Sequence, residues 1–130
     1  MDSEITQLFN TAKDILPRAY APYSHFHVAC VLKTRCGKVF HGVNVENISY
    51  SLTCCAEKNA ISTMVVEGGK AIEMIMVMSG ADRVCPPCGA CRQIIREFAD
   101  SDTRIILATL SGEFAEYAMS DMLPLAFDEI

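Results

Sequence analysis

Cys55-Ala56-Glu57, followed after 29 further residues by Pro87-Cys88-Gly89-Ala90-Cys91, is the stretch of this sequence that decides its fold and chemistry. It supplies three thiols and a carboxyl group at the spacing of a catalytic zinc site. Such a site uses three protein ligands and leaves the fourth position to water, which loses a proton near neutral pH. We therefore expect Cys55, Cys88 and Cys91 to bind Zn²⁺. Glu57 is expected to stay unbound and to shuttle protons.

Two neighbouring cysteines leave alternatives open. Cys85 stands three residues before Cys88, so a closed structural site of four cysteines is the rival to the open catalytic site. A closed site would leave Glu57 without a role, and the open site is therefore favoured. Cys54 directly precedes Cys55, but only Cys55 has the carboxylate two residues later, so Cys54 is expected to pack.

Composition limits the class of protein and of partner. The 130 residues are 51% hydrophobic and 21% charged, which is typical of a globular chain, and we expect one domain over residues 1–130. The net charge is −5 and no Lys/Arg cluster is present, which favours a small-molecule partner over a nucleic acid. No apolar run has membrane-spanning length and no signal-peptide pattern is present. An odd count of seven cysteines favours reduced thiols and hence the cytoplasm.

Hydrophobic periodicity predicts eight elements in the order α-β-β-α-β-α-β-β, which is typical of a sheet with helices on both faces. Ser3 is the expected cap of the first helix, and both metal-binding segments fall at helix starts, where free N–H groups favour thiolates. The predicted helices span residues 3–16, 55–67 and 88–98, and the predicted strands span 27–33, 38–45, 72–78, 104–110 and 113–119.

Asn44 and Glu46 lie at the end of the second predicted strand. Val43 precedes Asn44, and Val45 stands between Asn44 and Glu46. Alternation places the two polar side chains on one face. That face is either simply solvated or binds a pair of neighbouring hydroxyl groups, and spacing alone leaves these interpretations about even.

With these segments the chain resembles the short, homotetrameric cytidine deaminases. The resemblance extends over nearly the whole length, and its motifs occur in the expected order. They are Ala21-Pro22-Tyr23-Ser24 with Phe26, Gly42–Asn47, Cys55-Ala56-Glu57, Pro87–Gln93, and Leu123-Pro124 with Phe127.

The resemblance implies an α/β fold, a three-layer α/β/α sandwich with a mixed central sheet. It implies zinc-dependent hydrolytic deamination of cytidine and 2′-deoxycytidine, as in pyrimidine salvage. Asn44 and Glu46 would hold the ribose 3′-hydroxyl, Phe26 would line the pyrimidine pocket, and the backbone N–H of Ala56 would hold O2 of the ring. It further implies a homotetramer with shared active sites, to which each chain contributes substrate-binding residues, Tyr50 and Phe127.

Three departures from the family pattern affect these expectations. Lys58 stands where many short members have an arginine that donates to the zinc thiolates, so Lys58 becomes the expected charge partner, with Arg92 as a possible helper. Lysine carries the charge without the planar fork of arginine, and an altered pH profile is expected. Pro86 replaces a serine of which only the carbonyl is needed. Leu125 replaces a common glycine, which puts the position of Phe127 in question. The remaining rivals are a deaminase of another aminopyrimidine nucleoside, such as blasticidin S, and a non-enzymatic zinc domain.

Overall fold

The segment from Ile72 to Ser79, apolar except for Glu73 and Ser79, forms β3 (Ile72–Ser79), the central strand of the sheet. The computed structural model describes all 130 residues, and its sheet has the strand order β2-β1-β3-β4-β5. Only β3 and β4 are parallel, and the other neighbours are antiparallel, so the sheet is mixed. The flanking strands are β1 (Val28–Thr34), β2 (Val39–Val43), β4 (Arg104–Thr109) and β5 (Phe114–Tyr117).

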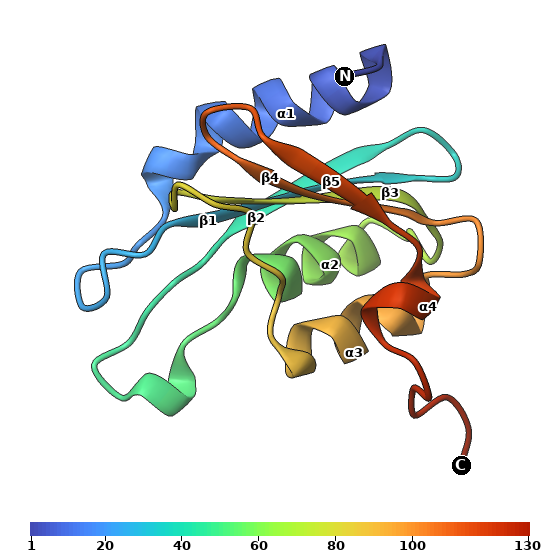
Figure 1. Cartoon of the computed structure of the whole chain (residues 1–130). Coiled ribbons are helices and arrows are strands. Elements are labelled where there is room, and N and C mark those ends of the chain that lie inside the picture. The colour runs from blue at the N-terminus through green and yellow to red at the C-terminus, as the bar shows by residue number, and fades with distance from the viewer.

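Helices cover both faces of this sheet (Figure 1). α1 (Ser3–Ile15) packs on one face, and its Ile5, Leu8 and Ala12 join β-strand side chains in one core cluster. α2 (Ala56–Val66) and α3 (Gly89–Phe98) pack on the other face around a second cluster. The three-layer α/β/α prediction is confirmed. None of the helices is both long and apolar enough to cross a membrane.

Some boundaries differ from the predictions. Asp2, and not Ser3, caps α1, because the Asp2 carboxylate accepts a 2.9 Å hydrogen bond from the N–H of Ile5. The second strand ends at Val43 and not at Val45. Beyond β2, Val45 forms two isolated β-bridges, one with Tyr20 and one with Cys54. Three short helices were missed, because three or four residues carry too little periodicity: η1 (Leu16–Arg18), η2 (Tyr50–Leu52) and α4 (Met119–Met122).

The start of α2 lies unusually close to β2. A Cβ atom at Gly42 would lie 2.6 Å from the backbone nitrogen of Ala60 and 2.8 Å from the carbonyl oxygen of Ala56. Such distances leave no room for a side chain, so glycine is required here for a close approach. Asn59 reinforces the contact by donating a 2.8 Å hydrogen bond to the carbonyl of Val43. β2 thereby fixes the turn of α2 that carries Glu57.

Candidate metal centre

Two helix starts meet at one pocket, and a cysteine caps each of them. Cys55 is the N-cap residue of α2 and Cys88 that of α3, and neither uses its side chain to cap the helix. Both sulfurs are therefore free for other partners. Helix starts carry partial positive charge, which favours thiolates. The predicted placement of the metal segments at helix starts is confirmed.

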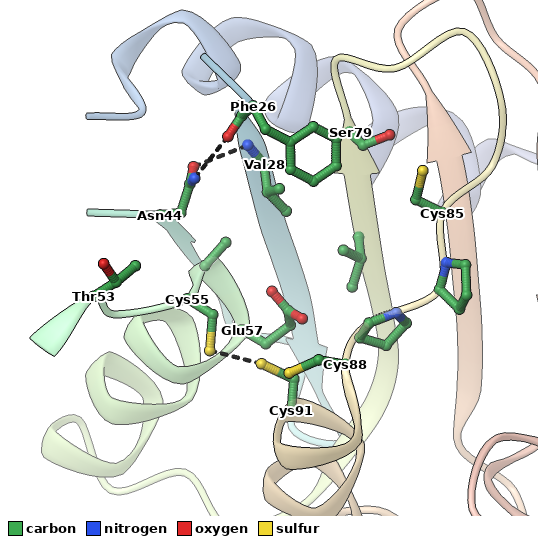
Figure 2. A pocket seen from close by; sticks show the side chains of 14 residues that line it. Phe26, Val28, Asn44, Thr53, Cys55, Glu57, Ser79, Cys85, Cys88 and Cys91 are labelled. Carbon is green, nitrogen blue, oxygen red and sulfur yellow. Dashed lines mark hydrogen bonds between the residues drawn. The ribbon is translucent and has the colours of Figure 1, made fainter. Parts of the chain in front are cut away.

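The sulfur atoms of Cys55 and Cys91 lie 2.6 Å apart, although the residues belong to different helices. These two sulfurs and a carboxylate oxygen of Glu57 all lie within 4.8 Å of one another. Cys88 lines the same pocket, and Figure 2 shows its side chain beside that of Cys91. Cys85 also lines the pocket, but its thiol donates to the carbonyl of Arg83 at 3.5 Å and points away from the other sulfurs (Figure 2).

The charge distribution favours a thiolate on Cys55. A hydrogen bond from the Cys91 thiol, helped by the backbone N–H of Lys58, lowers the pKa of Cys55 to about 6. The same hydrogen bond raises the pKa of Cys91, because Cys91 holds the shared proton. Burial raises the pKa of Glu57, whose side chain is 4% exposed. A cation bound between the sulfurs would take the place of that shared proton.

The donor set fits zinc. Thiolates are soft ligands, and Zn²⁺ accepts them readily in a four-coordinate site. Cys55 and Cys91 supply two such donors in the cluster with Glu57, and Cys88, which lines the same pocket but lies outside that cluster, stays the predicted third donor. Cys30 is fully buried in the core and Cys36 is on the surface. Glu57 lines the same pocket and offers a carboxyl group that would accept or donate a proton beside a bound ion.

A cavity of about 220 Å³ opens onto this cluster. Its walls come from the loop before β1, the starts of α2 and α3, the end of β3 and the segment before α3 (Figure 2). Of the residues predicted to bind substrate, three line it: Phe26, Asn44 and Ala56. The cavity therefore combines an aromatic ring, an amide and a buried carboxylate, which suits a small polar aromatic ligand.

Asn44 and Glu46 are buried, at 8% and 9% exposure, so the interpretation of a simply solvated face is wrong. Asn44 donates to the carbonyl of Phe26 at 2.8 Å and accepts from the N–H of Val28 at 2.9 Å. Glu46 accepts from the N–H groups of Tyr23 and Ser24 and from the Ser24 hydroxyl, which lowers its pKa. Both side chains thus shape the loop that carries Phe26. Asn44 keeps one amide hydrogen for a ligand.

Comparison with known proteins decides the family. The family model for the cytidine and deoxycytidylate deaminase zinc-binding region matches residues 2–109. The chain belongs to this deaminase family. It is 43% identical over 109 residues to a cytidine deaminase of Halalkalibacterium halodurans, covering 84% of this chain and 83% of that one. It is 35% identical over 126 residues to a cytidine deaminase of Sporosarcina psychrophila, covering 97% and 93%.

Solved structures agree with this assignment. The crystal structure of cytidine deaminase from Burkholderia pseudomallei superposes with a TM-score of 0.89 at 38% identity, covering 98% of this chain and all of that one. The blasticidin-S deaminase of Bacillus cereus is a more distant relative, 26% identical over 129 residues. The chain thus has the deaminase fold, and it is more similar in sequence to the two cytidine deaminases than to the blasticidin-S deaminase.

Four residues predicted from the deaminase resemblance are not among those that line the cavity: Glu46, Tyr50, Lys58 and Phe127. Tyr50 and Phe127 are 65% and 70% exposed, and Gln93 holds the carbonyl of Phe127 by a 2.7 Å hydrogen bond. Lys58 is exposed and lines a groove between α2 and α3. Leu125 adopts a left-handed backbone conformation with φ of 55°, a conformation that favours glycine over leucine. The roles of these residues stay predictions.

The sequence analysis did not predict Ser79 as a pocket residue. It predicted the zinc thiolates as partners of Arg92, whereas Arg92 bonds to backbone carbonyl groups. Ser79 is the polar residue that follows the five apolar residues 74–78 of β3, which is a signal for a site at a strand end. Arg92 donates from Nε to the carbonyl of Pro87 at 2.9 Å and from Nη1 to that of Met122 at 3.2 Å. It thereby ties the segment before Cys88 to α4.

Proposed function

We propose that this chain is a zinc-dependent cytidine deaminase that hydrolyses cytidine and 2′-deoxycytidine to uridine and 2′-deoxyuridine with release of ammonia. The observation that carries this proposal is the buried carboxylate of Glu57 beside the sulfurs of Cys55 and Cys91, at the bottom of a cavity sized for a small ligand. Relatives named cytidine deaminase support the substrate class.

In this proposal Cys55, Cys88 and Cys91 hold the zinc ion. Zn²⁺, when bound, acts as a Lewis acid that makes water a nucleophile at neutral pH. The two helix starts offset the charge of the thiolates, and the backbone N–H of Lys58 donates to Cys55. The ammonium group of Lys58 adds positive charge from outside the pocket and is the proposed charge partner of the thiolates.

Glu57 is the proposed catalytic residue. Burial raises the pKa of its carboxyl group, which suits a group that must both accept and release protons near neutral pH. Its carboxylate takes a proton from the attacking water as the oxygen adds to C4 of the pyrimidine. It passes this proton to N3, then takes the proton that remains on the new C4 hydroxyl group and passes it to the 4-amino nitrogen. The C4–N4 bond breaks as the C4=O bond forms, and ammonia leaves.

The substrate residues divide into base and ribose contacts. Phe26 packs against the pyrimidine, and the N–H of Ala56, at the start of α2, donates to O2 of the ring. The spare amide hydrogen of Asn44 and the carboxylate of Glu46 bind the ribose 3′-hydroxyl. Because both side chains also hold the 23–28 loop, ribose binding and the position of Phe26 are linked.

We further propose that residues 1–130 form one catalytic domain that assembles into a homotetramer with shared active sites. Tyr50 and Phe127 are exposed and lie outside their own cavity, as expected of residues that act in a neighbouring subunit. The exposed Val65 and Val66 of α2 add apolar surface for such contacts. The reduced thiols of the site are consistent with a role in the cytoplasm, in pyrimidine salvage.

The proposal is tested by ammonia release from cytidine and 2′-deoxycytidine, with purified zinc-loaded protein and a Glu57→Gln variant. We expect turnover by the wild type, and a variant that binds zinc normally but has lost at least about 10²-fold in kcat. Full activity of the variant would refute the role of Glu57. Turnover of blasticidin S without turnover of either cytidine substrate would assign the chain to that other substrate. Tight zinc binding without any turnover would favour a structural zinc site.

A further inference from the structure

Ser79 carries the one buried side-chain oxygen or nitrogen atom that lacks a hydrogen-bond partner. The residue is 3% exposed. The other buried hydroxyl groups are all paired: Thr34 bonds to Cys36 and accepts from the N–H of Lys38, Thr103 donates to the carbonyl of Ile72, and Thr109 bonds to Ser111. Buried hydroxyl groups without partners are rare, because the hydrogen bonds they make to water are lost on folding. The Ser79 hydroxyl group therefore calls for a partner that the chain does not supply.

Ser79 belongs to the wall of the catalytic cavity. It is the last residue of β3 and follows Val77, a second lining residue, by two positions, so that both side chains lie on one face of the strand. Figure 2 shows Ser79 between the ring of Phe26 and Cys85, across the cavity from Cys55 and the start of α2. Ser79 therefore belongs to the wall opposite Ala56, with its hydroxyl oxygen on the side of Cys85 (Figure 2).

The proposed function fixes which edge of the pyrimidine meets this wall, and the inference rests on it. The reacting C4 atom lies toward Glu57 and the sulfurs. The O2 atom of the ring needs a donor, and the free N–H groups at the start of α2 provide one. With O2 on the α2 side, the opposite edge of the ring, which carries C5 and C6, faces Val77 and Ser79.

We propose that the Ser79 hydroxyl is a specificity-determining group that hydrogen-bonds a polar substituent on C5 of the pyrimidine. The favoured ligand class is cytosine nucleosides with a hydroxyl group on a C5 substituent, such as 5-hydroxymethyl-2′-deoxycytidine. The reaction at C4 is unchanged. A hydroxyl group can donate and accept, so it pairs with a substrate hydroxyl in either direction. A 5-methyl group offers no such partner and leaves Ser79 unsatisfied.

The experiment compares kcat/KM for 2′-deoxycytidine and its 5-methyl and 5-hydroxymethyl derivatives in the wild type and in Ser79→Ala. We expect the hydroxymethyl-to-methyl ratio to exceed one in the wild type and to fall by about tenfold in Ser79→Ala. The electronic effect of each substituent on C4 is the same in both enzymes, so it divides out of this comparison. Only a contact with residue 79 changes the ratio.

Thr53→Val is the matched control, since Thr53 also lines the cavity, on the α2 side, and its hydroxyl group already accepts a 3.3 Å hydrogen bond from the N–H of Asn47. We expect its hydroxymethyl-to-methyl ratio to equal that of the wild type. An equal fall in both variants, or an unchanged ratio in Ser79→Ala, would overturn the inference. If Ser79→Ala does not fold, Ser79→Cys replaces it, because a thiol leaves no cavity at this site and is only a weak hydrogen-bonding group.

The outcomes separate this inference from the proposed function. Absence of 2′-deoxycytidine turnover by the wild type would refute the proposed function and the inference together. Normal 2′-deoxycytidine turnover with a ratio that does not depend on residue 79 would refute the inference alone. In that case the Ser79 hydroxyl group forms its hydrogen bond with a bound water molecule and not with a substituent of the substrate.

Discussion

Cys91 Sγ lies 2.6 Å from Cys55 Sγ across the gap between the starts of α3 and α2. A carboxylate oxygen of Glu57 lies within 4.8 Å of both sulfur atoms. The contact brings together residues that are 36 positions apart in the sequence. It is the geometric basis for treating the two segments as one metal centre.

Cysteine substitutions distinguish the open site from a closed one. We expect Cys55→Ser and Cys91→Ser to lose zinc, and Cys85→Ala to retain about one zinc ion per chain, because the Cys85 thiol bonds to the Arg83 carbonyl and points away from the cluster. The measurement is zinc content after gel filtration, by elemental analysis or a chromogenic chelator. Loss of zinc in Cys85→Ala would favour the four-cysteine structural site.

Gly42→Ala is expected to destabilise the fold by about 1–3 kcal/mol, because its Cβ would overlap the backbone of α2 at Ala56 and Ala60. The displaced helix turn carries Glu57, so kcat should fall as well. Urea unfolding and steady-state kinetics measure the two effects. Gly80→Ala is the matched control, since a Cβ there would meet no atom closer than 3.7 Å. Equal stability of the two variants would contradict the close packing.

Much of this architecture was predictable from local pattern. The apolar residues of β3 and the apolar face of α1, which recurs at helical spacing, predict the two core clusters. The cysteine motifs predict where α2 and α3 begin. These features depend on residues near one another in the sequence. The candidate site was predictable where a motif names its residues, as for Cys55, Glu57 and Cys91.

Long-range contacts were not predictable in the same way. The second role of Asn44, which holds the backbone of Phe26 and Val28, depends on where β2 ends and how the 23–28 loop returns to it. The lack of a partner for Ser79 depends on every group around it, and no sequence pattern contains that information. Periodicity identifies a buried face, but it does not identify which polar atoms on that face are satisfied.

Asn44→Ala is expected to raise KM for cytidine and also to lower the melting temperature. The substitution removes two hydrogen bonds to the backbone of residues 26 and 28, which corresponds to about 1–3 kcal/mol of stability. A residue that only binds ribose would change KM alone. Thermal unfolding and KM for cytidine separate the two roles. An unchanged KM would remove Asn44 from the ribose site and leave it as a structural residue.

Arg104 joins two acidic side chains at the edge of the sheet. Its guanidinium lies 2.9 Å from the carboxylate of Asp2 and 2.7 Å from that of Glu116. The hydrogen bond from the Ile5 N–H, followed by that from Arg104, lowers the pKa of Asp2, and Arg104 lowers that of Glu116. Both carboxyl groups thus ionise at a lower pH in the folded chain than in the unfolded one.

The lowered pKa values of Asp2 and Glu116 determine how the stability of the fold depends on pH. A lowered carboxyl pKa stabilises the fold above the unfolded values, 3.8 for Asp2 and 4.5 for Glu116, and that stabilisation is lost as the pH falls through the lowered native values. We expect Arg104→Met to have a lower urea midpoint than the wild type at pH 7, and the difference to shrink below about pH 4. Arg18→Met, which removes an arginine without an ion pair, is the control. A difference that stays constant from pH 7 to pH 3 would show that Arg104 acts through packing and not through its charge.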